Sequence, residues 1–302
     1  MAGTDYVLIT AARNEENYLP IVAEAVVTQT HRPKTWVIVN DRSTDGTEKI
    51  IRSYAARLSF IRSVLREQTD ANSNFASKVD ALTAGYQQIR DEEYDFVGHL
   101  DADISFDSDY FKCLIERFHG NTKLGLGGGF IYEQSGGHFE SRPFNTSRSV
   151  AGSVQLFRRA CYEAIGSFVP FVMGGEDAYA EVMARMKGWE VRSFPELKAF
   201  HHRKSTIARG IFREFFQYGA MDYALGNHPL FEILKALRRI RERPYVLATF
   251  LRMLGFTWSY WQRQERNVPE EFIRYARREQ MDILNARLGF THLASPSCEK
   301  KG

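Results

Sequence analysis

Two carboxylates separated by a single residue, Asp101 and Asp103, directly follow the apolar run Phe96–Leu100 in this chain of 302 residues. The run predicts a buried strand, and the chain leaves extended geometry at a strand's carboxyl end, so both carboxylates can turn toward one ligand. Hard cations such as Mg²⁺ and Mn²⁺ prefer oxygen ligands, and Mg²⁺ is usually held by one or two carboxylates together with substrate phosphates. The spacing is therefore typical of a cation site beside a phosphate-bearing substrate.

A structural role is the alternative for this pair. The pattern predicts a helix from Tyr110 to Phe118, and an acidic turn would cap its start. Asp107 or Ser108 already supplies such a cap, so the residues by themselves leave the metal site and the structural turn equally open.

A second acidic pair, Glu176 and Asp177, begins a predicted helix that Gly188 ends. Carboxylates at a helix start complement the helix dipole, which contributes about 0.3 to 1 kcal/mol for each and requires no function. The preceding glycines, Gly174 and Gly175, favour a functional interpretation, because they let a substrate approach where a side chain would block it.

Two histidines, His201 and His202, follow the strand-like segment Trp189–Phe194. A lone histidine in this position would more often be structural. A pair that follows a strand, in a chain that also has an Asp-x-Asp motif, is a candidate for a metal or diphosphate contact.

The alternation of apolar runs with amphipathic segments predicts the scaffold that positions these residues. Strands are predicted at 6–10, 35–39, 60–65 and 96–100, with helices that begin at Leu19, after Asp45 and at Ala76. Asp45 and Glu48 are spaced like a capping box for the second helix. Strands that alternate with helices imply an α/β fold, a parallel sheet with helices on both faces.

The segment after residue 118 is less regular. Leu124–Tyr132 predicts a further strand, whose glycines at 127–129 indicate the close approach of another backbone or a ligand. Residues 133–149 are polar and predict a long loop, whereas 152–168 are ordered and half apolar. No Gly-x-Gly-x-x-Gly or Walker A motif follows the first strand, which argues against a nicotinamide-binding Rossmann domain and a P-loop domain.

Composition narrows the class of protein. Three cysteines without Cys-x-x-Cys spacing argue against a disulfide framework and a zinc site, and they indicate a reducing, cytoplasmic compartment. The N-terminus lacks the features of a signal peptide, so export is not expected. The net charge of +3 is uneven: residues 204–302 carry 17 Lys and Arg against 10 Asp and Glu, whereas residues 1–203 carry 23 against 27. An anionic partner is expected for the last third.

Six ordered motifs within about residues 5–203 resemble the family 2 glycosyltransferases, inverting enzymes with the nucleotide-sugar-binding GT-A fold. Each motif is weak alone, but the ordered series is specific. The motifs are Arg13-Asn14-Glu15, Asn40-Asp41-x-Ser43-x-Asp45-Gly46-Thr47, Ala76-Ser77-Lys78 with Ala81 and Gly85, Asp101-x-Asp103, Gly152 with Arg158-Arg159, and Gly175-Glu176-Asp177.

The resemblance implies a role for each candidate residue. Asp41 would contact the nucleotide base, and Asp101 and Asp103 would hold the ribose and the Mn²⁺ or Mg²⁺ ion that bridges the diphosphate. Asp177 would be the catalytic base, with Glu176 beside it. The donor site would contain Ala12, Arg13, Glu15, Asp41, Lys78, Asp101 and Ala102; the metal shell would add His201 or His202; the acceptor would lie near Gly152, Gly175 and Glu176.

Inverting transfer requires a base that deprotonates the acceptor hydroxyl and a cation that neutralises the departing diphosphate, which fits this division of roles. The chain departs from the family pattern in two places. Its first strand lacks the proline common before the family's Asn-Glu, and no Gln-x-x-Arg-Trp follows Asp177. A single sugar addition is therefore expected, rather than the processive synthesis of cellulose or hyaluronan.

From Ile207 to Trp261, apolar and aromatic residues alternate with basic ones. One helical face contains Phe231, Leu234, Leu237 and Ile240 beside Lys235, Arg238, Arg239, Arg241 and Arg243. The longest uncharged run, Met253–Trp261, is too short to cross a bilayer. The pattern is typical of a helix that lies in an anionic membrane interface, although packing on the catalytic domain or on a second subunit explains it nearly as well. Nucleic acid is not an expected partner, because it explains neither the apolar face nor the donor motifs.

The sequence therefore predicts a GT-A catalytic domain over 1–204, a mostly parallel sheet flanked by helices, with the donor site at about 5–105 and the acceptor and base region at about 125–204. A C-terminal, basic, amphipathic helical extension is predicted over 205–290 and a disordered tail over 291–302.

The expected function is metal-dependent transfer of one sugar from a nucleotide-diphosphate sugar to a lipid-linked or polysaccharide acceptor, at the cytoplasmic inner face of the membrane. A UDP-sugar is the expected donor, and a homo-oligomer is compatible with the pattern. The alternative is a non-catalytic nucleotide-sugar sensor or scaffold of the same fold. A nucleotidyltransferase is less favoured, because Ala11-Ala12-Arg13 is not a glycine-rich phosphate loop.

Overall fold

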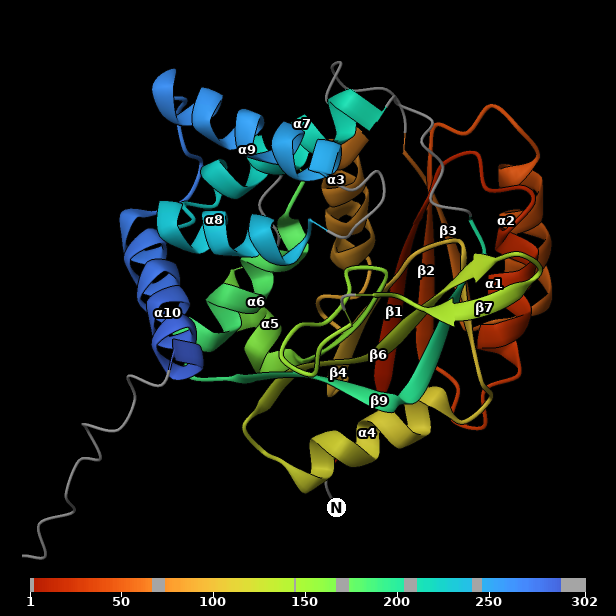
Figure 1. Ribbon diagram of the computed structural model, residues 1–302. Coiled ribbons are helices and arrows are strands. Elements are labelled where there is room, and N and C mark those ends of the chain that lie inside the picture. Colours follow the sequence, from red (N-terminus) through yellow and green to blue (C-terminus); the bar gives the residue numbers. More distant parts are fainter. Residues whose placement is uncertain are drawn as a thin grey trace, which may run out of the picture. The chain divides into compact units, whose positions relative to one another are not determined.

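The structure is a computed structural model that describes residues 3–66, 74–143, 145–166, 174–203, 211–240 and 246–288. The chain divides into two compact units, residues 1–206 and 207–302 (Figure 1). The tail predicted at 291–302 lies outside the described residues, as do Arg241 and Arg243.

Four apolar runs of the first unit form the parallel strands predicted from the sequence. They are β1 (Tyr6–Ala12), β2 (Thr35–Asp41), β3 (Ile61–Arg66) and β4 (Phe96–Leu100). The strands lie side by side in the order β3-β2-β1-β4, and every neighbouring pair is parallel. Because the four strands run in one direction, the residues that follow them lie at the same edge of the sheet.

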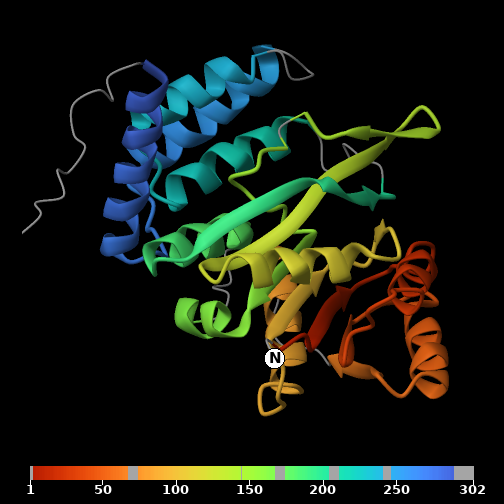
Figure 2. The same cartoon turned by 90° about the horizontal axis from the view of Figure 1, so that it is seen from below.

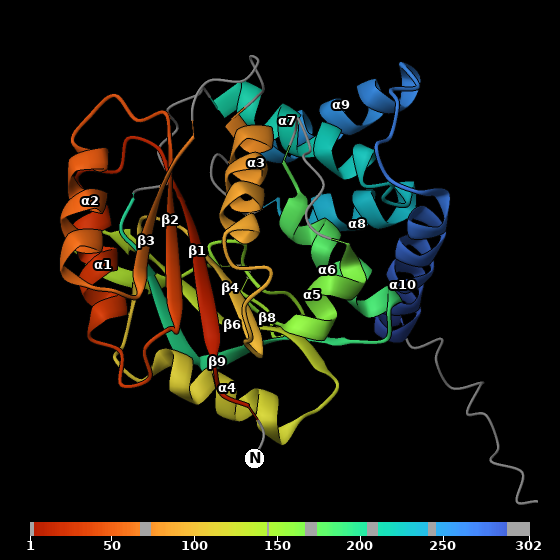
Figure 3. The same cartoon turned by 180° about the vertical axis from the view of Figure 1, so that it is seen from behind.

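Helices cover both faces of these strands, as predicted. They are α1 (Leu19–Val27), α2 (Thr47–Arg57), α3 (Asn74–Gln87) and α4 (Tyr110–Gly120). On one face, Tyr6 stacks on Phe111 of α4 with ring centroids 4.8 Å apart. On the other face, α3 lies against β1 and β2 (Figure 3). A Cβ added to Gly85 of α3 would lie 2.5 Å from the Ile9 side chain, so only glycine allows this contact. Alternate residues of β1 therefore pack against different helix layers.

The strands beyond β4 are mixed in direction. They are β5 (Ile104–Phe106), β6 (Leu124–Ser135), β7 (His138–Ser141), β8 (Val154–Arg158) and β9 (Glu190–His201). The sheet continues as β4-β8-β6-β9-β5, and β8 is antiparallel to both β4 and β6. Strands β6 and β9 are parallel and lie side by side along α4 (Figure 2). The predicted parallel arrangement is therefore continuous over the first four strands, and beyond them β6 and β9 form one further parallel pair among antiparallel ones.

Two predictions in this half need correction. The strand expected to stop near Phe194 continues to His201, because Pro195 falls in a register shift where it interrupts no ladder pair. The long loop expected at 133–149 is wrong in its first part, since β6 runs to Ser135 and turns back into β7. Gly136 and Gly137, with φ of 57° and 91°, supply the positive φ that this tight turn requires.

The glycines of β6 confirm the predicted close approach of another backbone. A Cβ on Gly129 would lie 2.3 Å from the carbonyl oxygen of Leu197 in β9. A Cβ on Gly128 would lie 2.8 Å from the carbonyl oxygen of Val154 in β8. Any side chain at these positions would separate β6 from its neighbours.

Both predicted helix caps are wrong. Glu48 pairs with Arg52 instead of closing a capping box, while Asp45 accepts from the backbone N–H of Thr47 and Glu16. At α4 no side chain caps the start, and the carbonyl of Asp107 accepts the Tyr110 N–H. Backbone and loop contacts therefore replace the local side-chain caps that the spacing suggested.

The part of the first unit between β8 and β9 contains α5 (Arg159–Ile165) and α6 (Glu176–Met186). The second unit consists, among the described residues, of α7 (Ile211–Ala224), α8 (Pro229–Arg238), α9 (Val246–Trp261) and α10 (Glu270–Leu288). None of the described helices is long and apolar enough to span a bilayer.

Helices α7 and α9 touch through their backbones. A Cβ on Gly219 would lie 1.9 Å from the Arg252 carbonyl oxygen, and one on Gly255 would lie 2.0 Å from that of Phe216. Asp222, 2% exposed, accepts from Arg252 and Lys235, each at 2.7 Å. A buried ionic cluster therefore joins α7, α8 and α9.

Candidate active site

The donor motifs gather at the carboxyl ends of the parallel strands. β1 ends at Ala12, β2 at Asp41, and β4 immediately before Asp101. The backbone N–H of Asp101 donates to the carbonyl of Ser153 at 2.8 Å, which joins this edge to the segment before β8. Ligands of open α/β sheets bind at such an edge.

Three carboxylates at this edge contact cationic side chains. Lys78 of α3 places Nζ 2.6 Å from Asp101 Oδ1. Arg203, two residues beyond β9, donates from Nε to Asp103 Oδ2 at 2.8 Å and pairs through Nη2 with Glu15. The protein's own cations therefore neutralise the negative charge that the three carboxylates bring together.

Burial and these partners set the protonation states. Burial raises the pKa of Glu15 to about 7, although the charge of Arg203 opposes the rise. Burial also acts to raise the pKa of Asp103, but hydrogen bonds and charges from His201 and Arg203 outweigh it and the pKa falls below its ordinary value. Burial acts to lower the pKa of Lys78, and nearby carboxylates more than offset this, so that pKa is raised. Asp103 and Lys78 are therefore charged at neutral pH.

The two histidines have different surroundings. His201 places Nε2 3.3 Å from Asp103 Oδ2. Burial acts to lower the pKa of His201, but the hydrogen bond and charge of Asp103 raise it overall. His202 places Nε2 2.7 Å from the Ser105 hydroxyl, and its ring meets the edge of Phe139. His201 therefore contacts the second carboxylate of the Asp-x-Asp motif, whereas His202 contacts β5 and β7.

The side chains of this edge have the chemistry that a divalent cation needs. Asp101, Asp103 and His201 supply oxygen and imidazole ligands of the kind that Mn²⁺ accepts. Among the described residues, however, no group of three His, Cys, Asp or Glu side chains is arranged to hold a metal. The donor set fits the ion, while in this arrangement Lys78 and Arg203 occupy its carboxylates.

Asp41, the residue expected to contact the base, is 3% exposed and surrounded by donors. Its carboxylate accepts from Ser77 Oγ at 2.6 Å, from Arg42 Nε at 3.0 Å and from Arg66 Nη1 at 3.1 Å. The expected base end of the donor site therefore contains two guanidinium groups, those of Arg42 and Arg66, which the Asn-Asp motif does not reveal.

The second acidic pair stands at the start of α6. Gly174 and Gly175 have φ of 84° and 99°, a left-handed conformation that glycine adopts without strain, so they shape the turn into the helix. Asp177 Oδ1 accepts from the Ala178 N–H at 2.8 Å. A Cβ on Gly152 would lie 2.9 Å from Asp177 Oδ2, so a side chain there would displace the carboxylate.

The segment 149–153 joins the two halves of the site, with Ser153 bonded to Asp101 and Gly152 against Asp177. Glu181, 5% exposed, holds the segment by accepting from Ser149 Oγ at 2.8 Å and from the Val150 N–H at 2.7 Å. Burial raises the pKa of Glu181 to about 7.

Sequence reasoning missed Glu181 and did not assign Arg203 to the site. The signal for Glu181 was an acidic residue one helical turn after Asp177 on the buried face of α6. Arg203 had no local signal beyond its place after the histidines, because its partner Glu15 is 188 residues away.

The remaining residues that were predicted to line the site differ in their exposure. Ala12 and Ala102 are 0% and 4% exposed, so they offer backbone atoms only. Arg13 is exposed. Glu176 is 9% exposed, and burial raises its pKa.

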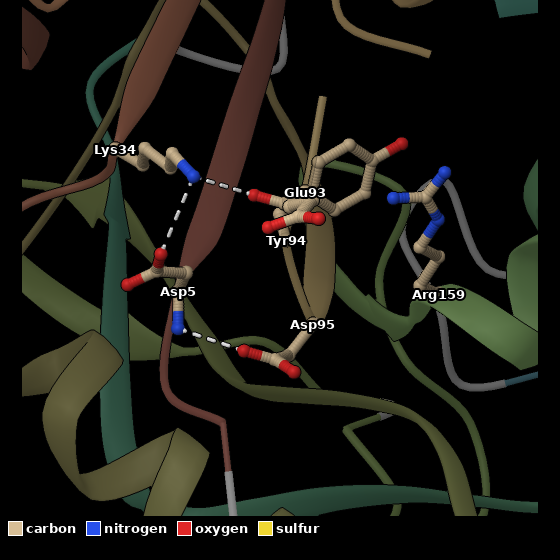
Figure 4. A pocket seen from close by; sticks show the side chains of 6 residues that line it. All are labelled: Asp5, Lys34, Glu93, Tyr94, Asp95 and Arg159. Carbon is tan, nitrogen blue, oxygen red and sulfur yellow. Dashed lines mark hydrogen bonds and ion pairs between the residues drawn. The ribbon is translucent and has the colours of Figure 1, made fainter. Parts of the chain in front are cut away.

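A cavity of about 330 Å³ lies at the opposite end of the parallel strands (Figure 4). It is lined by Asp5, Lys34, Glu93, Tyr94, Asp95 and Arg159. Lys34 pairs with Asp5 at 3.5 Å and donates to the Glu93 carbonyl at 2.7 Å, so much of the cavity's polar surface is internally paired. Because ligands of such sheets bind at the carboxyl ends of strands, this cavity is not the donor site.

Sequence comparison identifies relatives of this chain. The family model described as Glycosyl transferase family 2 matches residues 7–177, more than half of the chain. The poly-beta-1,6-N-acetyl-D-glucosamine synthase of Staphylococcus aureus (strain MSSA476) is 23% identical over 270 residues, which are 83% of this chain and 62% of the synthase. The chain thus spans less than two thirds of the length of this curated relative.

Solved structures show the same fold. S. aureus TarS 1-349 in complex with UDP-GlcNAc has a TM-score of 0.55 at 17% identity, over 94% of this chain and 92% of that one. Mannosyltransferase PcManGT from Pyrobaculum calidifontis, in complex with GDP-Man and Mn²⁺, also has a TM-score of 0.55, at 15% identity, over 94% and 79%. The motifs, the sheet and the family match agree, and the chain belongs to glycosyl transferase family 2, with the GT-A fold.

Proposed function

We propose that the chain is an inverting glycosyltransferase that moves one sugar from a nucleotide-diphosphate sugar to an acceptor hydroxyl. The observation that carries the proposal is the pair of contacts made by segment 149–153. Ser153 accepts from the backbone of Asp101, and the neighbouring Gly152 lies against Asp177. These two contacts hold Asp101 and the candidate base Asp177 on either side of residues 152 and 153.

Asp177 acts as the general base in this proposal. A single displacement needs a carboxylate that removes the acceptor proton as the hydroxyl attacks the anomeric carbon. The absence of a side chain at Gly152 leaves Oδ2 of Asp177 open to that hydroxyl. Glu176 is buried, and its pKa is raised by burial. We therefore assign it to contact with the acceptor rather than to neutralising nearby cations.

The proposed cation is Mn²⁺ or Mg²⁺, held by Asp101, Asp103 and His201. When bound, it would neutralise charge on the diphosphate leaving group. Lys78, which contacts Asp101 and is close enough to Glu176 for its charge to matter, adds a second positive charge between the donor and acceptor sides. The Mn²⁺ in the PcManGT complex supports this assignment.

A UDP-sugar is the proposed donor. TarS is solved with UDP-GlcNAc, and the S. aureus relative is a synthase of an N-acetylglucosamine polymer. The same relative supports a polysaccharide acceptor, and a lipid-linked acceptor is the alternative that we keep from the sequence. The absence of Gln-x-x-Arg-Trp after Asp177 supports one addition per binding event.

A thermal-shift screen of UDP, GDP, UDP-GlcNAc and GDP-Man, each with and without Mn²⁺, tests the donor assignment. A ligand that binds only the folded state stabilises it by about 2.7 kcal/mol at a concentration of 100 Kd. We expect UDP and UDP-GlcNAc to raise the Tm, more with Mn²⁺ than without. A larger shift with GDP-Man would overturn the choice of base, and no shift with any nucleotide would overturn the function.

The second unit is proposed to contact an anionic membrane. Apolar side chains are exposed at helical spacing along α8 and α9. On α8 and just beyond it these are Leu230, Ile233, Leu237 and Ile240, each 39–55% exposed, and on α9 they are Val246, Phe250, Leu254, Trp258 and Trp261, each 42–74% exposed. Exposed apolar stripes of this length are typical of a contact surface.

Charge favours a lipid surface over a protein. Helices α8 and α9 contain one carboxylate between them, Glu232, and it is 0% exposed. Arg238 is exposed at the end of α8. A surface with apolar stripes, aromatic residues and no exposed negative charge fits anionic headgroups above an acyl layer, where each basic residue contributes about 1 kcal/mol. This would place the enzyme at the cytoplasmic leaflet.

Co-sedimentation with anionic and neutral vesicles tests this contact. We expect the chain to bind anionic vesicles, and a Phe250→Ser, Trp258→Ser, Trp261→Ser variant to remain in the supernatant. Ile21→Ser, which changes an apolar residue of the first unit that is 40% exposed, is the matched control. If the wild type binds neither lipid and forms a dimer that the triple variant disrupts, the surface is a homo-oligomer interface and the membrane proposal is wrong.

A further inference from the structure

Arg203 bridges two carboxylates that come from distant parts of the chain. Its Nε donates to Asp103 Oδ2 at 2.8 Å, and its Nη2 pairs with Glu15. Glu15 follows β1, Asp103 follows β4 and Arg203 follows β9, so this guanidinium links the ends of three strands. A planar guanidinium is suited to such a bridge, because its donors point in fixed directions.

The site around Arg203 is preformed. The guanidinium lies 5.2 Å from the ring centre of Tyr18, which supports one of its faces. The side chains of Asp103 and Glu15 are 9% and 13% exposed, whereas that of Arg203 is 42% exposed. The carboxylates are therefore fixed within the fold, while the cation between them has a path to solvent.

Arg203 and a divalent cation would compete for the same oxygen. Asp103 Oδ2 already accepts from Arg203 and also lies 3.3 Å from His201 Nε2. A metal bound to that oxygen would stand next to the guanidinium, and two cations so close repel each other. One of them must leave Asp103.

We infer that Arg203 is a built-in counter-ion, which holds Asp103 and Glu15 while the donor site is empty and releases Asp103 when a divalent cation binds with the nucleotide diphosphate. This inference rests on the proposed function. It predicts that the free enzyme binds Mn²⁺ weakly and that UDP strengthens Mn²⁺ binding, because the diphosphate supplies ligands that Arg203 does not occupy.

Calorimetric titration of Mn²⁺ into wild type and Arg203→Gln, with and without UDP, tests the inference without an activity assay. Removal of the guanidinium leaves Asp103 free, so we expect Arg203→Gln to bind Mn²⁺ alone about tenfold more tightly than wild type. The factor by which UDP improves Mn²⁺ affinity should shrink in the variant. Arg203→Lys keeps the charge but cannot bridge both carboxylates, so it should fall between the two.

Arg90→Gln is the matched control, because it removes a guanidinium whose partner is the exposed Asp91. The control should bind Mn²⁺ like wild type. Equal or weaker binding of Mn²⁺ alone by Arg203→Gln would overturn the counter-ion role, and if that variant does not fold, the same comparison with Arg203→Lys decides. Absence of Mn²⁺ binding to wild type even with UDP would contradict the proposed metal, and the inference would fall with it.

Discussion

The proposed donor side of the site, around Asp101 and Asp103, and the proposed base side, around Asp177, surround their carboxylates with different partners. On the donor side, Asp101 lies 2.6 Å from Lys78, and Asp103 lies 2.8 Å from Arg203. On the base side, Asp177 accepts from the backbone N–H of Ala178, and no ion pair joins it to another residue that the structure describes. The carboxylates of Asp101 and Asp103 are therefore paired with cationic side chains, whereas that of Asp177 is held by a backbone N–H.

The different partners suit the two sides to different chemistry. A carboxylate paired with a cation stays ionised and suits the exchange of one cation for another, such as a metal with its diphosphate. A carboxylate held by a backbone N–H at a helix start keeps a fixed orientation, which a general base needs. The comparison predicts that loss of the carboxylate on the base side reduces the rate, whereas loss of a carboxylate on the donor side reduces binding of the cation and the donor.

The largest effect is expected from Asp177→Asn. Loss of a general base typically lowers the rate by about 10² to 10⁴-fold, so kcat should fall by that factor while the KM for the donor stays nearly unchanged. Steady-state kinetics with UDP-sugar and acceptor measure both constants. Substantial retained turnover would mean that Asp177 is not the base.

A smaller effect, on metal dependence, is expected from Asp103→Ala. Removal of a proposed ligand should raise the Mn²⁺ concentration needed for half-maximal turnover by at least about tenfold. Mn²⁺ titration after treatment with EDTA measures this dependence. If turnover is indifferent to EDTA in wild type, the cation assignment on the donor side is wrong.

Glu181 should influence the base side through segment 149–153. Glu181→Ala removes the acceptor of two hydrogen bonds, leaves the buried Val150 N–H unsatisfied at a cost of about 1 to 3 kcal/mol, and loosens Gly152 against Asp177. We expect about a tenfold loss of kcat with little change in donor KM, and near-complete rescue in Glu181→Gln, which keeps an acceptor oxygen. Equal losses in both variants would show that charge rather than position matters.

A further effect concerns the stability of the fold and its dependence on pH, rather than the rate or binding. Burial raises the pKa of Glu181 from 4.5 to about 7, so the folded state favours the protonated form. The stability that this protonation provides is complete below pH 4.5 and is lost as the pH rises through 7, with a size of at most about 3 kcal/mol. Relative to Glu181→Gln, the Tm of wild type should fall between pH 5 and 8. A constant difference in Tm would contradict the raised pKa.

The sequence predicted the parts of the site that depend on local patterns. The apolar run before Asp101 gives a strand that ends at the ligand edge, and the glycines before Glu176 give a turn into a helix. Both results follow from residues within a few positions of one another. The resemblance to family 2 then suggested a role for each candidate residue.

The contacts that distinguish the two sides could not be predicted from the sequence, because they join residues that are far apart in the chain. The pair of Arg203 with Glu15 spans 188 positions, and the bond from Ser149 to Glu181 spans 32. The extent of β9 was missed because Pro195 normally argues against a strand interior, and only the register shift opposite β6 accommodates it. In the second unit, periodicity did not predict that the inward face of α8 contains Glu232, whose charge is compensated by Lys235 and by Arg252 of α9.

The most direct test of the difference between the two sides is the affinity for UDP-GlcNAc in the presence of Mn²⁺, measured by calorimetry for wild type, Asp177→Asn and Asp103→Asn. We predict that Asp177→Asn binds within about twofold of wild type, and that Asp103→Asn binds at least about tenfold more weakly. Loss of donor affinity in Asp177→Asn as large as that in Asp103→Asn would contradict the separation of donor binding from proton removal.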